Sequence, residues 1–200
     1  MKIGVLALQG AVAEHMATLS ELNVKAVPIY LPSELNSLDG LIIPGGESTT
    51  ISKLMLDYNL AEPIQKLASQ GLPIFGTCAG MILLASKLTG SNSVRPLGLM
   101  DIEVKRNAFG RQVDSFEVDL PIPALGDKAF RGIFIRAPAI EKTGPEVEIL
   151  CQLGDGSAVA VRQGKSLACA FHPELTSDLR FHKYFLALAA GDVLAKSNNR

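Results

Sequence analysis

The sequence PIFGTCAGMILL, residues 73–84, joins two apolar runs through the segment GTCAG. Gly76 and Gly80 stand two residues before and two residues after Cys78, which is the thiol form of the G-x-S-x-G pattern of sharp strand-to-helix turns. Only small residues fit at those two positions, because larger side chains would clash across the turn. The stretch therefore predicts a buried strand, a tight turn that presents Cys78, and a helix over MILLASKL, residues 81–88.

The first half of the chain repeats this alternation of strand and helix. Short apolar runs edged by Gly or Pro suit strands that are covered on both faces. Between them, apolar side chains recur at helical spacing. Strand, helix and strand in alternation build a parallel sheet with helices on both faces. The strand segments are residues 2–8, 25–30, 40–44 and 72–76, and the helical patterns cover residues 12–22 and 51–67.

The second half changes character, because polar and apolar residues now alternate. This pattern predicts antiparallel strands or hairpins. A last amphipathic helix is expected from about residue 178 to residue 195. No shift in composition marks a linker, so we predict one α/β domain, residues 1–200, with a mostly parallel central sheet between helical layers and antiparallel strands in its second half. The strand segments are 98–106, 114–122, 146–153, 157–163 and 166–172, with tight turns at 154–156 and 163–165.

The bulk composition excludes several classes of protein. With 20 acidic and 19 basic residues the chain is nearly neutral, which argues against nucleic acid or an anionic membrane as the main partner. No apolar run approaches the ~18 residues of a membrane span, and the first one, residues 3–8, is shorter than the core of a signal peptide. Three widely spaced cysteines form neither a disulfide framework nor a zinc ribbon. We therefore expect a cytoplasmic protein.

Cys78 stands where a nucleophile can be activated. The partial positive charge at the start of the following helix favours a thiolate, and the N–H of Ala79 would point to where an oxyanion forms. The alternative is a small buried residue beside glycines that allow close packing, since free cysteines are usually buried. The register of strand, glycine pair and helix favours the nucleophile. Cys151 and Cys169 lie within apolar strand patterns and are expected in the core.

One of the three histidines stands in a setting suited to a base. In AFHPEL, His172 follows a strand and Glu174 is two residues further on. Side chains two apart in an extended segment share a side, so the carboxylate could bind one imidazole nitrogen and leave the other for the thiol. His15 and His182 fall on predicted helices, and their positions there fit a structural role as well as a catalytic one. A metal site at Cys169 and His172 is the rival, but no further ligand has a suggestive spacing, so we expect no metal.

A second glycine-rich segment, PGGESTT, covers residues 44–50 at the end of a predicted strand. Loops at the carboxyl ends of parallel strands line one crevice, so this loop and Cys78 should meet. Gly45 and Gly46 allow the backbone to turn an N–H inward as a second oxyanion donor. Ser48 and Thr49 are expected to cap the next helix. A phosphate-binding loop is the rival, but the Walker lysine is absent.

The motifs PGGES, GTCAGM and FHPE, in this order, resemble the class I, triad-type glutamine amidotransferases. Within them, the chain is similar over essentially its whole length to the glutaminase subunits of pyridoxal 5′-phosphate synthase. This narrower resemblance rests on LALQGAVAEH, PGGESTT, RNAFGRQVDSFE, FIRAP and FHPELT, which begin at residues 6, 44, 106, 134 and 171. It implies a flavodoxin-like fold and hydrolysis of L-glutamine to L-glutamate and ammonia through a cysteine thioester. It also implies a separate (β/α)-barrel synthase subunit as partner, which uses the ammonia to make the vitamin B6 coenzyme, and no cofactor for the glutaminase itself.

The resemblance also implies the site residues. Cys78 would be the nucleophile, His172 the base and acid, and Glu174 the group that orients the imidazole. The N–H groups of Gly46 and Ala79 would hold the oxyanion. An arginine fork suits the α-carboxylate of glutamine and a glutamate suits its ammonium group, although a solvated surface charge is the usual fate of an arginine. The residues implied to bind glutamine are Gly46, Glu47, Ser48, Arg106, Ile135 and Arg136.

The chemistry itself predicts a partner. Ammonia released into water is protonated and stops being a nucleophile, so its transfer needs a dry route into a second site. We therefore expect low activity in isolation and activation by the partner, with the loop Gln9, Gly10 and Ala11 lining the contact. The rivals are a glutaminase subunit of another amidotransferase, such as one serving histidine or purine synthesis, and a catalytically inactive interaction subunit. A redox sensor or chaperone with a cysteine elbow is a rival of another class, but it would not need His172 beside Glu174.

Overall fold

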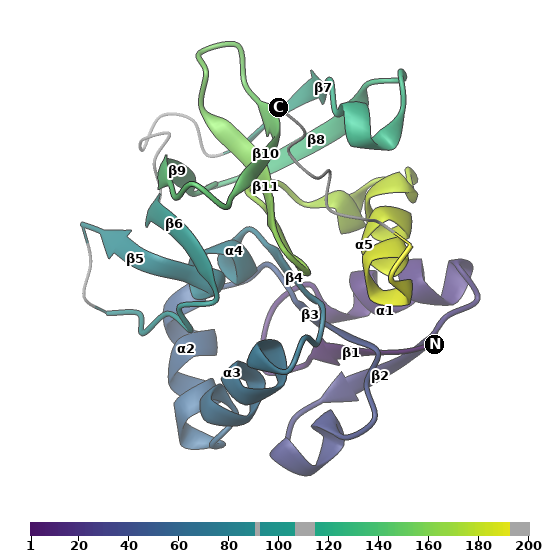
Figure 1. Cartoon of the computed structure of the whole chain (residues 1–200), viewed down its shortest axis with the longest axis vertical. Helices are drawn as coiled ribbons and strands as arrows, with labels where there is room; N and C mark the ends of the chain where they lie inside the picture. Colours follow the sequence, from purple (N-terminus) through teal and green to yellow (C-terminus); the bar gives the residue numbers. More distant parts are fainter. Residues whose placement is uncertain (91–92, 107–114, 193–200) are drawn as a thin grey trace.

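The computed structural model describes residues 1–90, 93–106 and 115–192 (Figure 1). Within them, one ten-stranded sheet has the order β2-β1-β3-β4-β12-β11-β9-β6-β5, with β10 paired to β11, and β7 and β8 form a separate ribbon. The strands are β1 (Lys2–Leu6), β2 (Lys25–Ile29), β3 (Gly40–Ile43), β4 (Ile74–Thr77), β5 (Ala85–Thr89), β6 (Met100–Lys105), β7 (Ser115–Leu120), β8 (Phe130–Ile135), β9 (Ala139–Thr143), β10 (Glu148–Gln152), β11 (Ala158–Gln163) and β12 (Ser166–Cys169). The α-helices are α1 (Val12–Glu21), α2 (Ser48–Asp57), α3 (Ala61–Ser69), α4 (Ala79–Leu84) and α5 (Arg180–Ala190).

The first half is the predicted parallel, three-layer arrangement. Strands β2, β1, β3, β4 and β12 all pair in parallel. The chain steps one way along the sheet from β1 to β2 and the other way from β3 to β4. Because such crossovers are right-handed, α1 lies on one face of the sheet, and α2 and α3 lie on the other. Helix α5 lies beside α1 on the same face (Figure 1). The direction reverses between β1 and β3, which is where parallel sheets form their binding crevice.

The second half extends the same sheet with antiparallel strands, as predicted. β12 pairs in parallel with β4 and antiparallel with β11, so it joins the two halves. The predicted turns at residues 154–156 and 163–165 connect β10 to β11 and β11 to β12. Because this sheet is continuous across both halves, we propose that residues 1–200 form one domain. No helix in the described ranges is long and apolar enough to cross a membrane.

The helix after Cys78 is shorter than predicted. It ends at Leu84, and the chain continues as strand β5 beside β6 instead of remaining helical to residue 88. The carbonyl oxygens of Leu83 and Leu84 accept N–H groups from Leu97 and Leu99, at 2.7 and 2.9 Å. These contacts from a later segment replace the helical hydrogen bonds, and no local pattern in ASKL could signal them.

Several further boundaries differ from the predictions. β8 and β9 were not predicted, and β1 ends two residues early. α5 ends at Ala190, where Gly191 adopts φ 81° as a left-handed cap. Residues 193–195 of the predicted helix, and residue 114 of the predicted strand, lie outside the described residues.

Candidate active site

Cys78 occupies the turn between β4 and α4 with a strained backbone. Its φ of 48° and ψ of −100° are unusual for a residue with a side chain. A Cβ atom added to Gly76 would lie 2.6 Å from the carbonyl carbon of Gly80, and one added to Gly80 would lie 2.0 Å from the carbonyl oxygen of Ile43. The Cys78 N–H donates to the carbonyl oxygen of Cys169 at 2.8 Å. Close backbone packing therefore requires both glycines, as the sequence predicted.

Gly80→Ala should destabilise the chain by about 1–3 kcal/mol or more, because the added methyl group meets the backbone of β3, which has no side-chain freedom to move away. Gly154→Ala is the matched control, since nothing lies within 4 Å of the place that its added methyl group would occupy, and it should change stability by less than about 0.5 kcal/mol. Urea unfolding of both variants measures the difference. Equal stability of the two variants would contradict this account of the turn.

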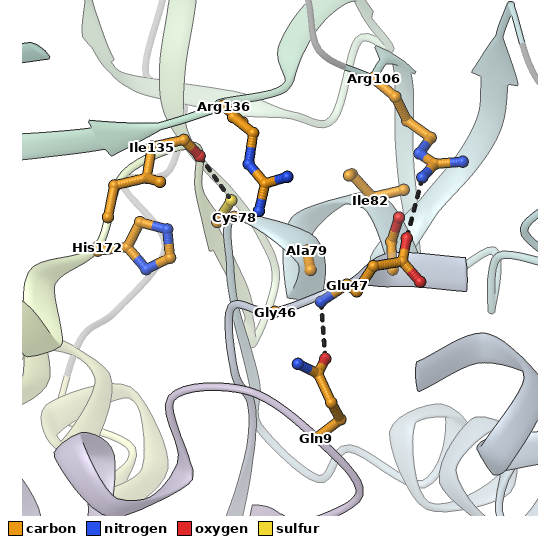
Figure 2. Close-up of a pocket in the computed structure, with 11 residues that line it drawn as sticks. Gln9, Gly46, Glu47, Cys78, Ala79, Ile82, Arg106, Ile135, Arg136 and His172 are labelled. Carbon is orange, nitrogen blue, oxygen red and sulfur yellow. Dashed lines mark hydrogen bonds and ion pairs between the residues drawn. The ribbon is translucent and has the colours of Figure 1, made fainter. Parts of the chain in front are cut away.

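His172 and Glu174 lie in a row with Cys78. His172 Nδ1 is 2.7 Å from Glu174 Oε1, and Figure 2 shows the other ring nitrogen turned toward Cys78. The backbone N–H of His172 donates to Ile133 of β8 at 2.8 Å, which fixes the start of the HPE turn. The Cys78 thiol also points at the carbonyl oxygen of Ile135, 3.8 Å from Sγ. The three groups that the sequence singled out are thus brought together.

The surroundings of His172 favour its protonated ring. Burial alone would lower the pKa of His172, but hydrogen bonding to Cys78 and to Glu174 outweighs burial and raises this pKa to about 10. At neutral pH both nitrogens of the ring are therefore protonated, and the ring is positively charged. A cation beside the sulfur stabilises a thiolate, which is the reactive form of a cysteine.

NMR of the imidazole nitrogens should show His172 protonated at neutral pH and losing its proton toward pH 10. Because the folded-state pKa lies above the unfolded value near 6.5, the stability that the charged ring contributes is complete below that pH and is lost as the pH rises through about 10. Cys78→Ala removes one of the two hydrogen bonds that raise the pKa, so the ring should then titrate at lower pH. A neutral His172 ring at neutral pH in the unsubstituted chain would refute this account.

Cys78 opens into a pocket of about 270 Å³. All six predicted glutamine-binding residues line it, as does Ala79 (Figure 2). Gln9 and Ile82 also line the pocket and were not predicted as glutamine contacts. Ile82 had a usable signal, because it lies three residues after Ala79 and so faces the same side of the helix. The lining is Gln9, Gly46, Glu47, Ser48, Cys78, Ala79, Ile82, Arg106, Ile135, Arg136 and His172.

Glu47 has two roles in the pocket wall. Its carboxylate caps α2 by accepting the N–H groups of Thr49 and Thr50, at 3.1 and 2.6 Å. The prediction that Ser48 or Thr49 caps this helix was therefore wrong, because Ser48 is already its first residue and Thr49 supplies a backbone donor. Arg106 reaches the same carboxylate, with Nη2 3.3 Å from Oε1. Burial alone would raise the pKa of Glu47, but the hydrogen bonds from Thr50 and Thr49 lower it, so this wall of the pocket carries a negative charge.

The PGGES loop meets the cysteine elbow, as predicted. A Cβ atom on Gly45 would lie 2.4 Å from His172 Cε1 and 3.5 Å from Cys78 Cβ, so only glycine allows this approach. The carbonyl oxygen of Gly45 accepts the N–H of Ala11 at 2.9 Å. Since this peptide is trans, the N–H of Gly46 points away from Ala11.

The other two cysteines lie in the core, as predicted. Cys169 is fully buried and Cys151 is 4% exposed. Burial raises the pKa of both thiols, that of Cys151 to about 11. Among the residues that the structure describes, no group of three or more His, Cys, Asp or Glu side chains is arranged to hold a metal ion.

The fold and the row of thiol, imidazole and carboxylate at one pocket are those of a class I glutamine amidotransferase. One chain of PurLQS from Thermotoga maritima shares the fold, with a TM-score of 0.71, 16% identity, and 92% and 96% of the two chains covered. A crystal structure of a glutamine amidotransferase is much closer, with a TM-score of 0.89, 49% identity, and 94% and 98% covered.

The particular family follows from the sequence. The model of the SNO glutamine amidotransferase family matches residues 5–190, and the chain belongs to this family. Pyridoxal 5′-phosphate synthase subunit PdxT of Pelotomaculum thermopropionicum is 59% identical over 186 residues, which cover 93% of this chain and 94% of that protein.

Proposed function

We propose that this chain is the glutaminase subunit of a pyridoxal 5′-phosphate synthase. It hydrolyses L-glutamine to L-glutamate and ammonia, and the ammonia passes to a separate (β/α)-barrel subunit that builds the coenzyme. Similarity to a named subunit of this synthase over more than nine-tenths of both chains supports the pathway. The observation that carries the chemistry is the row of Cys78, His172 and Glu174 at the pocket.

Glutamine would enter with its side-chain amide toward Cys78. Arg106 and Arg136 are the cations of the pocket lining and suit the α-carboxylate. Glu47 suits the α-ammonium group, and the bound substrate would then share this carboxylate with Arg106. Gly46, Ser48 and Ile135 complete the contacts with the substrate.

In the first step, Cys78 Sγ attacks the amide carbon and forms a tetrahedral oxyanion, which the N–H groups of Gly46 and Ala79 stabilise. His172 then gives its proton to the departing nitrogen, so that the C–N bond breaks and ammonia and a thioester remain. Water attacks the thioester while His172 takes its proton, and breakdown of the second tetrahedral intermediate releases glutamate and the thiolate. Glu174 holds the imidazole in the orientation that both steps need.

The loop after β1 is the proposed point of contact with the barrel subunit. Gln9 and Gly10 are exposed, and Gln9 Oε1 accepts the N–H of Glu47 at 2.7 Å. The N–H of Ala11 donates to the carbonyl oxygen of Gly45. This loop therefore makes hydrogen bonds to the peptide groups on both sides of Gly46. A partner that docks on it would therefore act directly on a proposed oxyanion donor.

Glutamate release should be low for the chain alone and should rise when the barrel subunit is added. Formation of the coenzyme from glutamine by the mixture distinguishes this subunit from those of histidine or purine synthesis. Full activity in isolation would refute coupling to a partner.

We also propose a cytoplasmic location, because the three cysteines are free thiols, as in a reducing compartment.

A further inference from the structure

A buried polar group lies behind the triad and has no role in the proposed reaction. His15 of α1 and His182 of α5 are both fully buried, and His15 Nδ1 is 3.0 Å from His182 Nε2. The other nitrogen of His15, Nε2, lies 3.2 Å from Thr77 Oγ1 and 3.6 Å from Glu174 Oε2. Two histidines thus stand in line behind the carboxylate that orients His172.

Both rings are neutral, so each carries one N–H whose position matters. Burial, followed by the proximity of His182 and His172, lowers the pKa of His15 well below 6.5. Burial lowers the pKa of His182 to about 4. Each ring therefore has one donor and one acceptor nitrogen, and the shared contact between the rings admits two arrangements.

The surrounding atoms decide between these arrangements. If His15 donated from Nδ1, its Nε2 lone pair would face the Glu174 carboxylate, and His182 would carry a buried N–H on Nδ1 without an acceptor. If His182 donates from Nε2 instead, His15 Nε2–H points at Thr77 and Glu174, and only an acceptor nitrogen of His182 is left unpaired. The second arrangement also points an N–H at Glu174 Oε2, which lies 3.6 Å away, is buried and has no hydrogen-bond partner among the described residues. It costs less, because an orphaned N–H is the more expensive loss.

Thr77 extends this line to the PGGES loop. Its Oγ1 accepts the N–H of Gly45 at 2.9 Å, and Gly45 precedes the peptide whose N–H is the proposed oxyanion donor. His15 Nε2 therefore lies near the second oxygen of the carboxylate that orients the base, and within hydrogen-bond reach of the hydroxyl that holds the oxyanion loop.

We propose that His15 is a positioning residue of the glutaminase site: its Nε2–H donates to the Thr77 hydroxyl and faces the charge on Glu174 Oε2, and His182 fixes the tautomer that makes this possible. The inference rests on the proposed function. It assigns no contact with the substrate to either histidine. Its effect is to keep the carboxylate of the triad and the oxyanion loop in one fixed relation.

Two amide substitutions separate the two contacts of His15. The amide nitrogen of glutamine reaches the place of imidazole Nε2, whereas that of asparagine reaches the place of Nδ1. In the complex with the barrel subunit, His15→Asn should lower kcat about 10²-fold, the scale of a small misplacement of catalytic groups. His15→Gln should keep most of the original kcat. Both variants should leave KM for glutamine within about threefold, because neither side chain touches the pocket.

Equal kcat for the two variants, or better rescue by asparagine, would overturn the proposal. NMR of the imidazole nitrogens of the unsubstituted chain gives a second test that does not need a folded variant. It should find the proton of His15 on Nε2, and a proton on Nδ1 would overturn the proposal. If the unsubstituted complex does not hydrolyse glutamine, the proposed function is wrong. If the complex is active and His15→Asn leaves kcat unchanged, only this inference is wrong.

Discussion

Cys78→Ala should abolish glutamine hydrolysis while the chain still folds and still binds its partner. Without the sulfur no thioester forms, and the remaining oxyanion donors can only assist attack by water. The loss of kcat should be on the order of 10⁶-fold, as when the nucleophile of a triad is removed. Alanine keeps a Cβ atom at φ 48°, so the strain of the turn is unchanged. The Cys78 side chain lines the pocket, so removal of its sulfur enlarges an existing pocket and leaves no new cavity in the core.

The measurement is glutamate release by the complex, together with calorimetric binding of glutamine to Cys78→Ala. Binding should survive, because the residues proposed to hold the substrate remain in place. Cys151→Ala is the matched control, since this cysteine is 4% exposed and does not line the pocket. Hydrolysis that continues in Cys78→Ala at more than a hundredth of the original rate, by order of magnitude, would mean that another group attacks the amide.

His172→Gln should be nearly as damaging, with a loss of roughly 10⁴- to 10⁶-fold in kcat, because a neutral amide can neither protonate the leaving ammonia nor take a proton from water. Glu174→Gln tests the same site through the hydrogen bond of 2.7 Å to His172 Nδ1. Its amide N–H would favour the wrong imidazole tautomer, and a loss of about 10⁴-fold is expected. Single-turnover rates and thermal unfolding of each complex separate lost chemistry from lost folding. Activity within about tenfold of the original for His172→Gln would remove His172 from the mechanism.

The parts of the site that the sequence predicted are those with a local pattern. The glycines around Cys78 and the two-residue spacing of His172 and Glu174 each specify a geometry within a few residues of chain. The meeting of the PGGES loop with Cys78 followed from one topological rule, that loops at the carboxyl ends of parallel strands share a crevice. The resemblance supplied Arg106 and Arg136, which no spacing marks as functional.

The features that were missed depend on contacts between distant segments. The strand after Leu84 forms because N–H groups of a segment more than ten residues later donate hydrogen bonds to the carbonyl oxygens at the end of the helix. The cap of α2 comes from Glu47, which is an uncommon capping residue and is held by Arg106, just after the end of β6. The contact between His15 and Glu174 spans most of the chain, and the helical face of His15 is equally compatible with an ordinary core residue.

The rival of a redox sensor or chaperone differs from the proposed enzyme in its response to substrate. Such a protein would need an accessible thiol, but it has no use for a buried carboxylate held to an imidazole or for a pocket lined by two arginines and a glutamate. The separating property is therefore whether glutamine protects the thiol.

Mass spectrometry of the chain after treatment with a diazo-ketone analogue of glutamine tests the central claim most directly. A sulfur poised to attack the amide carbon of a bound glutamine would take up a single label, mapped to the peptide that contains Cys78, and excess glutamine would prevent it. Label on Cys151 or Cys169 instead, or uptake by Cys78 that glutamine does not slow, would contradict the claim.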